Sequence, residues 1–331
     1  MNKIWIEKYR PGNLDGIVGQ KVNVEKLRSF VRTGDLPHMI FAGPAGTGKT
    51  TAAMAMAIEL FGESWKENFL ELNASNNRGI NVIRGHEDRE GRMDGMVSVK
   101  DYARIMPSNA RGFKIIFLDE ADQLTQEAQA ALRRTMEIYS STTRFIFSCN
   151  YSSQIIPPIQ SRCVVLRFRP ISDAEVAEHI LTIAKEESME LSRESAEAVA
   201  DISGGDMRAA INLLQAVQYS GDHSPSKIYE IAGTAEIKEF DRALILALEH
   251  MDFKKASEVV DRLVIDRGLS GIDIVRGLHA AIRKSDIEPL KKTEAFMAIA
   301  DAEFRLVEGG SDKIQLDYLV SRLVRIGSNF N

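Results

Sequence analysis

The sequence is poor in cysteine and has no long apolar run. It contains 331 residues but only two cysteines, Cys149 and Cys163, which are too few and too poorly spaced for a zinc site. No apolar stretch approaches the roughly 18–20 residues of a membrane-spanning helix, and the N-terminus MNKIWIEKYRP has no signal-peptide core. Both cysteines flank apolar runs, so we expect buried free thiols, a reducing cytoplasmic location and no membrane partner.

The chain also lacks a strong charge of either sign. Its net charge is −5, whereas nucleic-acid-binding domains are often strongly basic. Residues 1–165 carry 21 Lys and Arg against 18 Asp and Glu, a net charge of +3, which leaves −8 for the remainder. Any polyanion should therefore meet the N-terminal half, although a difference this small permits DNA binding without showing it.

Composition and length fit a globular protein of two or three domains. Hydrophobic residues make up 44% of the chain and charged residues 27%. Five short apolar runs with helical stretches between most of them predict a parallel sheet with helices on both faces; they are residues 39–43, 69–73, 114–119, 144–149 and 163–168. After these runs the apolar spacing becomes helical, and Ser172 with Glu175 predicts a capping box at the first helix.

Glycine-rich and polar breaks divide this helical part. They fall at residues 203–206, 219–226 and 267–271, and YSGDHSPSK is the best candidate linker. We predict an α/β P-loop domain at 1–165, a small helical domain at 166–231 and an all-α domain at 232–331.

A phosphate-binding motif lies in the first of these domains. GPAGTGKT matches G-x-x-x-x-G-K-[ST] and stands between a predicted strand and a predicted helix, as the motif requires. Lys49 is expected to reach the β- and γ-phosphates, and Thr50 to supply a hydroxyl to Mg²⁺. The predicted ATP-binding residues here are Gly43, Pro44, Ala45, Gly46, Thr47, Gly48, Lys49, Thr50 and Thr51. A glycine-rich turn without a ligand is the alternative.

Acidic and polar residues follow the next predicted strands. In KIIFLDEAD, Asp119 would hold hydrated Mg²⁺ and Glu120 would polarise the attacking water. An acidic pair after a strand is often only a helix N-cap, but here the P-loop precedes it. Asn150 could orient the water or contact the γ-phosphate, and a turn asparagine is the alternative. Arg208 would contact the γ-phosphate from the second domain, although alone it would be a surface arginine.

Arg162, in SRC, has no obvious partner within the chain. A lone surface arginine is usually a solvated charge. WIEKYRP, GPAGTGKT, NAS, LDEAD, LRRTME, SCNYSSQIIPPIQSRC and GGDMRAAIN together resemble the small-subunit family of archaeal replication factor C, the AAA+ clamp loaders. The resemblance covers nearly the whole chain.

The resemblance implies an ATPase that works in a heteropentamer. Its partners would be a large subunit, other small subunits, a ring-shaped sliding clamp and primer–template DNA, and its cofactors ATP and Mg²⁺. The three domains become an AAA+ domain, a helical lid and a helical collar for oligomerisation. Arg162 matches the arginine finger that completes a neighbour's site, with Asn150 as sensor 1 and Arg208 as sensor 2. The residues that match the adenine-binding segment are Tyr9, Arg10, Pro11, Ile17 and Val18.

Further contacts are implied on the same basis. Arg133 and Arg134 match a subunit-interface motif, although exposed helix arginines would look the same. Tyr102, Met106 and Pro107 match the clamp-facing end of a helix, although an apolar tip there could be core. Arg84 matches a DNA-contacting position, and Arg89, Arg92 and Lys100 could add contacts that nearby acidic residues partly cancel.

The chain departs from the family pattern in three places. Ala45 replaces the usual proline, and Asn76-Asn77 replaces an acidic pair. About a dozen extra residues, including Gly85, Gly91 and Gly95, interrupt a helix between residues 81 and 107. Each glycine would weaken a continuous helix by about 1 kcal/mol relative to alanine, so we expect a break or loop.

Two other functions compete with clamp loading. One is another AAA+ DNA-replication or repair ATPase, such as a helicase loader or branch-migration motor, which would usually add a winged-helix domain with a β-hairpin. The other is a scaffold subunit that binds nucleotide without hydrolysing it; intact Lys49, Glu120 and Arg162 argue against that.

Overall fold

The structure, a computed structural model, describes residues 4–75, 98–232 and 235–329. The chain divides into two compact units, residues 1–228 and 229–331, and each is described by itself. The predicted DNA-contacting residues Arg84, Arg89 and Arg92 lie outside the described residues, as do Gly85, Gly91 and Gly95 of the predicted helix interruption.

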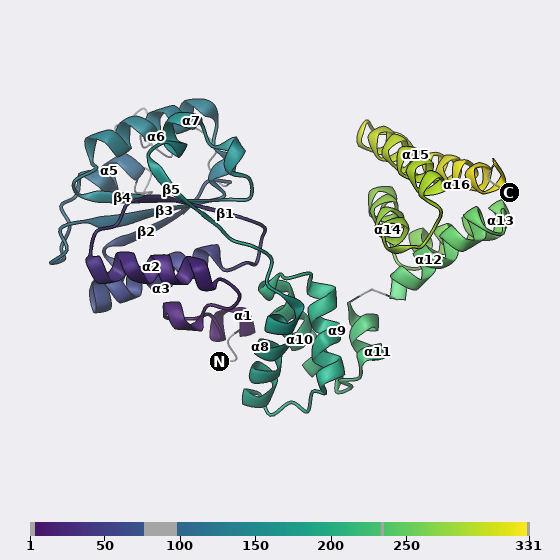
Figure 1. Cartoon of the computed structure of the whole chain (residues 1–331), viewed down its shortest axis with the longest axis horizontal. Coiled ribbons are helices and arrows are strands. Elements are labelled where there is room, and N and C mark those ends of the chain that lie inside the picture. Colours follow the sequence, from purple (N-terminus) through teal and green to yellow (C-terminus); the bar gives the residue numbers. More distant parts are fainter. Residues whose placement is uncertain (1–3, 76–97, 233–234, 330–331) are drawn as a thin grey trace, which may run out of the picture. The chain divides into compact units, whose positions relative to one another are not determined.

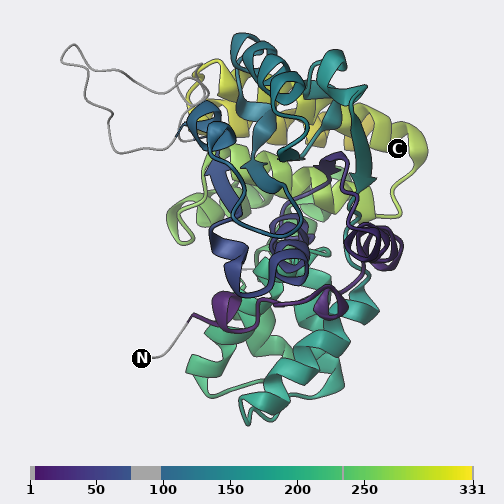
Figure 2. The same cartoon turned by 90° about the vertical axis from the view of Figure 1, so that its left-hand side faces the viewer.

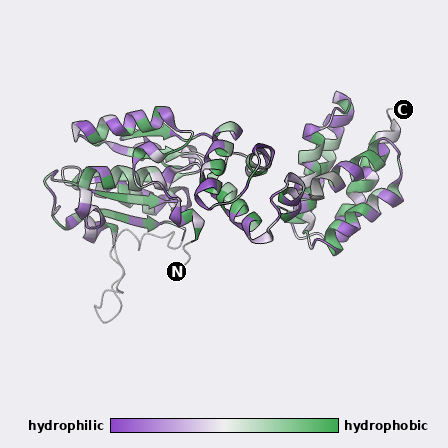
Figure 3. Ribbon diagram, turned by 90° about the horizontal axis from the view of Figure 1, so that it is seen from below, coloured by the Kyte–Doolittle hydropathy of each residue, from purple (hydrophilic) through white to green (hydrophobic). Residues whose placement is uncertain are grey.

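The first unit is built on a parallel sheet. Its strand order is β2-β3-β4-β1-β5, and every adjacent pair is parallel. The strands are β1 (His38–Ala42), β2 (Phe69–Asn73), β3 (Lys114–Asp119), β4 (Thr143–Cys149) and β5 (Cys163–Arg167). They coincide with the five predicted apolar runs, and Figure 3 shows their hydrophobic colouring.

Helices cover both faces of this sheet because alternate strand residues point to opposite sides. Met39 and Phe41 of β1 pack in the core beneath α2 (Lys21–Thr33) and α3 (Lys49–Phe61). Ile40 of β1 belongs to the opposite core, with residues of α5 (Val99–Arg104), α6 (Gln126–Ile138) and α7 (Pro157–Gln160). Figure 1 shows the two helical layers on either side of the sheet. The predicted fold class, a parallel sheet with helices on both faces, is confirmed for this unit.

Short elements link the strands and helices of this layer. They are α1 (Trp5–Lys8), η1 (Leu14–Gly16), η2 (Gly62–Lys66), η3 (Ala121–Gln123) and η4 (Ser152–Gln154). The N-terminal segment crosses to the helices that follow the sheet, where the backbone N–H of Trp5 donates to Gln215 Oε1 at 3.2 Å.

A helical bundle completes the first unit. It contains α8 (Asp173–Glu186), α9 (Arg193–Ser203) and α10 (Met207–Ser220), which pack against one another (Figure 2), and α11 (Pro225–Ile231) follows. Ser172 caps α8 as predicted, since its side chain accepts from the backbone N–H of Glu175. Only half of the capping box forms, because the Glu175 carboxylate accepts from the Ser172 hydroxyl at 2.7 Å instead of from its backbone.

The second unit contains helices and no strand among its described residues, as predicted. It contains α12 (Ala235–Leu248), α13 (Phe253–Ile265), α14 (Gly271–Lys284), α15 (Pro289–Val307) and α16 (Asp312–Asn329), which share one hydrophobic core. No helix in the described part of the chain is long and apolar enough to cross a membrane.

Candidate nucleotide-binding site

The P-loop connects the end of β1 to the start of α3. Gly46 and Gly48 adopt left-handed conformations, with φ of +67° and +91°, which glycine tolerates without a steric penalty. The first N–H groups of α3 have no partner within the helix, so they are available to phosphate oxygens. Thr47 instead turns inward, because its hydroxyl donates to the Pro44 carbonyl at 2.9 Å and its side chain is buried.

Lys49 is held against the loop itself. Its ammonium donates to the carbonyls of Gly43 at 2.6 Å and Pro44 at 2.7 Å. Burial lowers the pKa of Lys49, while the negative charge of Asp119 opposes that shift. A phosphate could replace the two carbonyls as the hydrogen-bond partner of the Lys49 ammonium without moving α3.

Thr50 and Asp119 bring together the oxygen atoms that a magnesium site needs. The Thr50 hydroxyl donates to Asp119 Oδ2 at 3.0 Å. Mg²⁺ is usually held by one or two carboxylates together with substrate phosphates and water. Within the described parts of the chain, no three His, Cys, Asp or Glu side chains form a metal site of their own. The pair therefore fits Mg²⁺ that arrives with a nucleotide.

Glu120 has an unusual backbone for a non-glycine residue. Its φ is +51° and its ψ +39°, in the left-handed region, which costs an L-residue roughly 1–2 kcal/mol. Its backbone N–H donates to Asp119 Oδ1 at 3.0 Å. The conformation ends β3 abruptly and leaves the exposed Glu120 side chain lining the same pocket as Lys49.

These residues form one cleft, which we call the phosphate pocket. It is lined by Ala45, Gly46, Gly48, Lys49, Thr50, Thr51, Asp119, Glu120, Asp122, Ser148, Cys149, Asn150 and Arg208. The structure thus brings the predicted Asn150 and Arg208 to the predicted P-loop. Gly43 and Pro44 support Lys49 through their carbonyls, but neither they nor Thr47 line the cleft. Asp122 and Ser148 were not predicted as site residues.

A second, largely apolar cleft adjoins the first, and we call it the base pocket. Both clefts share Gly46, Gly48, Thr51 and Arg208. The base pocket has a volume of about 630 Å³ including its open mouth. Its lining includes all five residues predicted to contact adenine: Tyr9, Arg10, Pro11, Ile17 and Val18.

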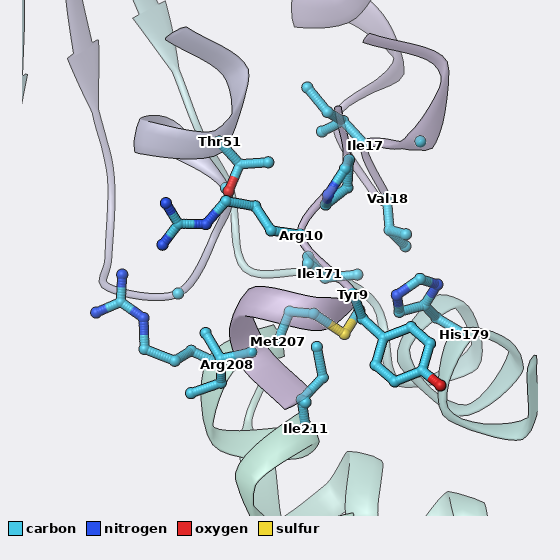
Figure 4. Close-up of a pocket in the computed structure, with 15 residues that line it drawn as sticks. Tyr9, Arg10, Ile17, Val18, Thr51, Ile171, His179, Met207, Arg208 and Ile211 are labelled. Atoms are coloured by element: carbon cyan, nitrogen blue, oxygen red, sulfur yellow. The ribbon is translucent and has the colours of Figure 1, made fainter. Parts of the chain in front are cut away.

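The other wall of the base pocket comes from the helical bundle. Figure 4 shows Ile17 and Val18 on one side of the cleft, with Met207 and Ile211 of α10 on the other. His179 of α8 and Ile171 also line it. Burial lowers the pKa of His179, with Glu186 opposing the shift. The sequence analysis assigned none of these four residues to the site. Met207 and Ile211 lie within GGDMRAAIN, but they reach the cleft only through packing.

Hydrogen bonds at two places tie the bundle to the site. The backbone N–H of Met207 donates to the Gly46 carbonyl at 3.1 Å. On the other side, Tyr9 Oη and Lys8 Nζ donate to Glu187 Oε1 at 2.7 and 2.6 Å. The P-loop and the N-terminal segment are therefore both bonded to the helices that close the base pocket.

Arg162 precedes β5 and lies at the end of the strands opposite to the P-loop. Cys163 pairs with His38 at the start of β1, and Arg167 pairs with Ala42, after which the P-loop begins. At about 3.3 Å per residue, the strand separates Arg162 from the P-loop edge by roughly 16 Å. Its side chain bonds Glu137 and the Pro158 carbonyl and lines neither pocket.

The remaining predicted contacts lie elsewhere on the first unit. Lys100, Arg133 and Arg134 are exposed on helices. Met106 is 75% exposed beside exposed Ile105, so the predicted apolar tip exists. Tyr102 supports that tip: its hydroxyl donates to the Glu67 carbonyl at 2.9 Å, and its ring lies 4.4 Å from the ammonium of buried Lys114.

The cysteines are free, as predicted. Cys149 is buried and Cys163 half-buried, and burial raises the pKa of each thiol to about 12.

Comparison with known proteins identifies close relatives. Residues 39–171 match the model of the ATPase family associated with various cellular activities, and residues 224–322 match the replication factor C C-terminal domain. The chain is 56% identical over 328 residues to the replication factor C small subunit of Picrophilus torridus, covering 99% of both chains. It is 56% identical to that of Thermoplasma volcanium, covering 100% of both chains.

Solved structures show the same fold at greater distance. The RuvB Holliday junction branch migration motor of Thermotoga maritima has a TM-score of 0.53 and 20% identity, with 78% of this chain and 88% of that chain covered.

Proposed function

The chain belongs to the replication factor C small-subunit family, and from this premise we propose that it is an ATP-driven subunit of a clamp loader. Its proposed work is to open a sliding clamp and load it onto primer–template DNA during replication. It would act in a heteropentamer with a large subunit and other small subunits. The observation that carries this proposal is the position of Arg162. It lies at the opposite end of the strands from the phosphate pocket, whose described lining includes Arg208 but not Arg162.

Nucleotide binding follows from the two adjoining pockets. The base would lie between Ile17 and Val18 on one side and Met207 and Ile211 on the other. The phosphates would lie on the N–H groups of the P-loop, with Lys49 exchanging its carbonyl partners for phosphate oxygens. Mg²⁺ held by Thr50 and Asp119 would neutralise charge on the β- and γ-phosphates.

Hydrolysis would then depend mainly on positioning. Glu120, held at the rim by its left-handed backbone, would accept a hydrogen bond from the attacking water. Asn150 would orient that water or the γ-phosphate, and Arg208 would contact the γ-phosphate from α10. Arg162 of a neighbouring subunit would stabilise the charge that develops on the transferred group, an effect on the order of 10³–10⁵ in rate.

Other surfaces of the chain suit the proposed partners. Exposed Ile105 and Met106 offer an apolar tip to a clamp, and Lys100 offers a phosphate contact to DNA. On α15, Leu290, Met297 and Phe304 are exposed at seven-residue intervals. This spacing places them on one face, which suits helix packing between collar domains.

The test is ATPase measurement on the complex purified with its large subunit. We expect hydrolysis to rise when clamp and primed DNA are added together, and to fall in complexes carrying Lys49→Ala or Glu120→Gln. Stimulation by neither clamp nor DNA would contradict clamp loading. An unchanged rate with Glu120→Gln would instead indicate the scaffold role.

The branch-migration or helicase-loader alternative has less support. The second unit shows no β-hairpin in its described residues, and its sequence matches the replication factor C C-terminal domain. The likeness to RuvB, at 20% identity, concerns the fold alone.

A further inference from the structure

Asp122 joins the loops that follow two neighbouring strands. It lies in η3, three residues beyond the end of β3, and its Oδ2 accepts from the backbone N–H of Asn150 at 3.0 Å. Asn150 directly follows β4, which pairs with β3. One carboxylate oxygen of Asp122 therefore fixes the backbone of the residue whose amide enters the phosphate pocket.

The other oxygen of Asp122 is an unused acceptor. Oδ1 is buried and has no hydrogen-bond partner among the residues that the structure describes, and Asp122 itself lines the phosphate pocket. Ser148, 1% exposed and in the same pocket, has a hydroxyl that is equally unpartnered there. Leaving a buried polar group unsatisfied costs about 1–3 kcal/mol.

The usual structural role for such an aspartate is already filled. An acidic residue between a strand and a helix often caps the helix, but Thr125 caps α6 by accepting from the backbone N–H of Ala128. Asp122 also makes no salt bridge among the described residues. Helix capping therefore does not explain why Asp122 contacts Asn150.

We infer that Asp122 is a positioning residue for ATP hydrolysis, which holds Asn150 through its backbone N–H. The inference rests on the proposed ATPase function. Asp122 would not touch the phosphates; it would set where the Asn150 amide points. Displacing a catalytic group by about 1 Å can cost on the order of 10²-fold in rate.

The test compares Asp122→Ala, Asp122→Asn, Asn150→Ala and the Asp122→Ala/Asn150→Ala double variant in the assembled complex. Asp122→Ala should lower kcat by about 10- to 10²-fold, with the Kd for ATP nearly unchanged, because the loss is in positioning and not in ground-state binding. Asp122→Asn keeps an oxygen for the Asn150 N–H and should recover most of the rate. The double variant should be no slower than Asn150→Ala alone, because Asp122 acts through Asn150.

Several results would overturn the inference. Multiplicative losses in the double variant would show that the two residues act independently. A parallel loss of ATP binding and melting temperature would show a merely structural role; Asp122→Asn, with its amide oxygen, decides the matter if Asp122→Ala does not fold. Asp201→Ala, an exposed site on α9, is the matched control. If Lys49→Ala leaves hydrolysis intact, the proposed function has failed instead.

Discussion

Arg162 donates a hydrogen bond from Nη2 to Glu137 Oε1 at 2.8 Å, and the same oxygen accepts from Arg133 Nε at 3.1 Å. The hydrogen bond from Arg133, followed by the charges of Arg133 and Arg162, lowers the pKa of Glu137. Glu137 thus holds two arginines together on an exposed surface, and Arg162 lies at the end of the strands remote from its own P-loop. In a subunit that completes its neighbour's site, Glu137 would hold both arginine side chains in position before the neighbour binds.

Arg162→Ala should therefore separate binding from hydrolysis. We expect the isolated chain to bind ATP with nearly unchanged affinity, because Arg162 lines neither pocket. In the assembled complex, each site that receives Arg162 should lose most of an effect on the order of 10³–10⁵. Isothermal titration and steady-state ATPase assays measure the two quantities. Arg193→Ala is the control, since Arg193 forms a similar exposed pair with Glu197 at 3.1 Å. Loss of ATP binding by the isolated variant would contradict a role in trans.

Gly46→Ala should weaken nucleotide binding through a steric conflict with Asp206, the residue that caps α10. A Cβ at Gly46 would lie 1.6 Å from Asp206 Oδ1, the carboxylate that caps α10. Either the P-loop must shift, or the Asp206 side chain must move and give up its hydrogen bond to the backbone N–H of Ala209 in α10. We expect the affinity for ATP to fall by more than tenfold, which corresponds to about 1.4 kcal/mol.

Gly221→Ala is the matched control for this variant. Gly221 also has a left-handed backbone, with φ of +72° and ψ of −6°, but a Cβ there would meet nothing within 4 Å. Both variants should lose about 1–2 kcal/mol of unfolding free energy from the left-handed backbone. Equal ATP affinity in the two variants would show that the contact with Asp206 does not matter.

Much of this fold could be predicted from the sequence, because the signals are local. The β3 run KIIFLD is continuously apolar because its strand is buried on both faces, and its predicted bounds are those observed. The P-loop could be predicted equally well, because the geometry of phosphate binding explains why glycine, lysine and threonine occur at fixed spacing. These features depend on neighbouring residues, so one sequence suffices to find them.

The missed residues depend on distant contacts. His179 and Ile211 look like ordinary helix residues until α8 and α10 pack against the N-terminal segment. Asp122 is the last residue of LDEAD and had no predicted role, and only the meeting of β3 and β4 brings it to Asn150. Arg162 could be linked to a neighbouring chain only through family resemblance; the strand register shows only that Arg162 is remote from its own P-loop.

Glu187→Gln should weaken ATP binding, although Glu187 lines neither pocket. Glu187 accepts from both Tyr9 and Lys8, which fixes one wall of the base pocket to the end of α8. These donors lower the pKa of Glu187, Lys8 contributing most. Hydrogen bonds to charged groups contribute about 1.5–3 kcal/mol, and part of that should appear as a several-fold rise in Kd. Titration with a fluorescent ATP analogue would measure it. Glu178→Gln, exposed on the same helix, should have no effect; if the two variants match, the wall is fixed by other contacts.

Protonation of His38 should lower the unfolding free energy of the first unit in mild acid. Its Nδ1 accepts from the backbone N–H of Phe145 at 3.1 Å, so the neutral ring is required at the start of β1. Burial, assisted by the positive charge of Arg144, lowers the pKa of His38 from 6.5 to about 4. The unfolded chain therefore binds a proton between these pH values while the folded chain does not, so stability falls as the pH drops from 6.5 to 4. The loss from this residue should approach roughly 3 kcal/mol at pH 4.

His38→Asn removes the titration but keeps an oxygen close to the position of Nδ1. We expect the variant to be less stable at pH 7, because the ring contact with Phe145 is lost. Its unfolding free energy should nevertheless fall less steeply than that of the wild type between pH 6.5 and 4. Both tryptophans, Trp5 and Trp65, belong to the first unit, so their fluorescence during urea unfolding reports on the part of the chain that contains His38. Carboxylates also titrate in this range, but they are common to both proteins and cancel in the difference. Equal slopes for wild type and His38→Asn would mean that His38 is protonated in the folded protein.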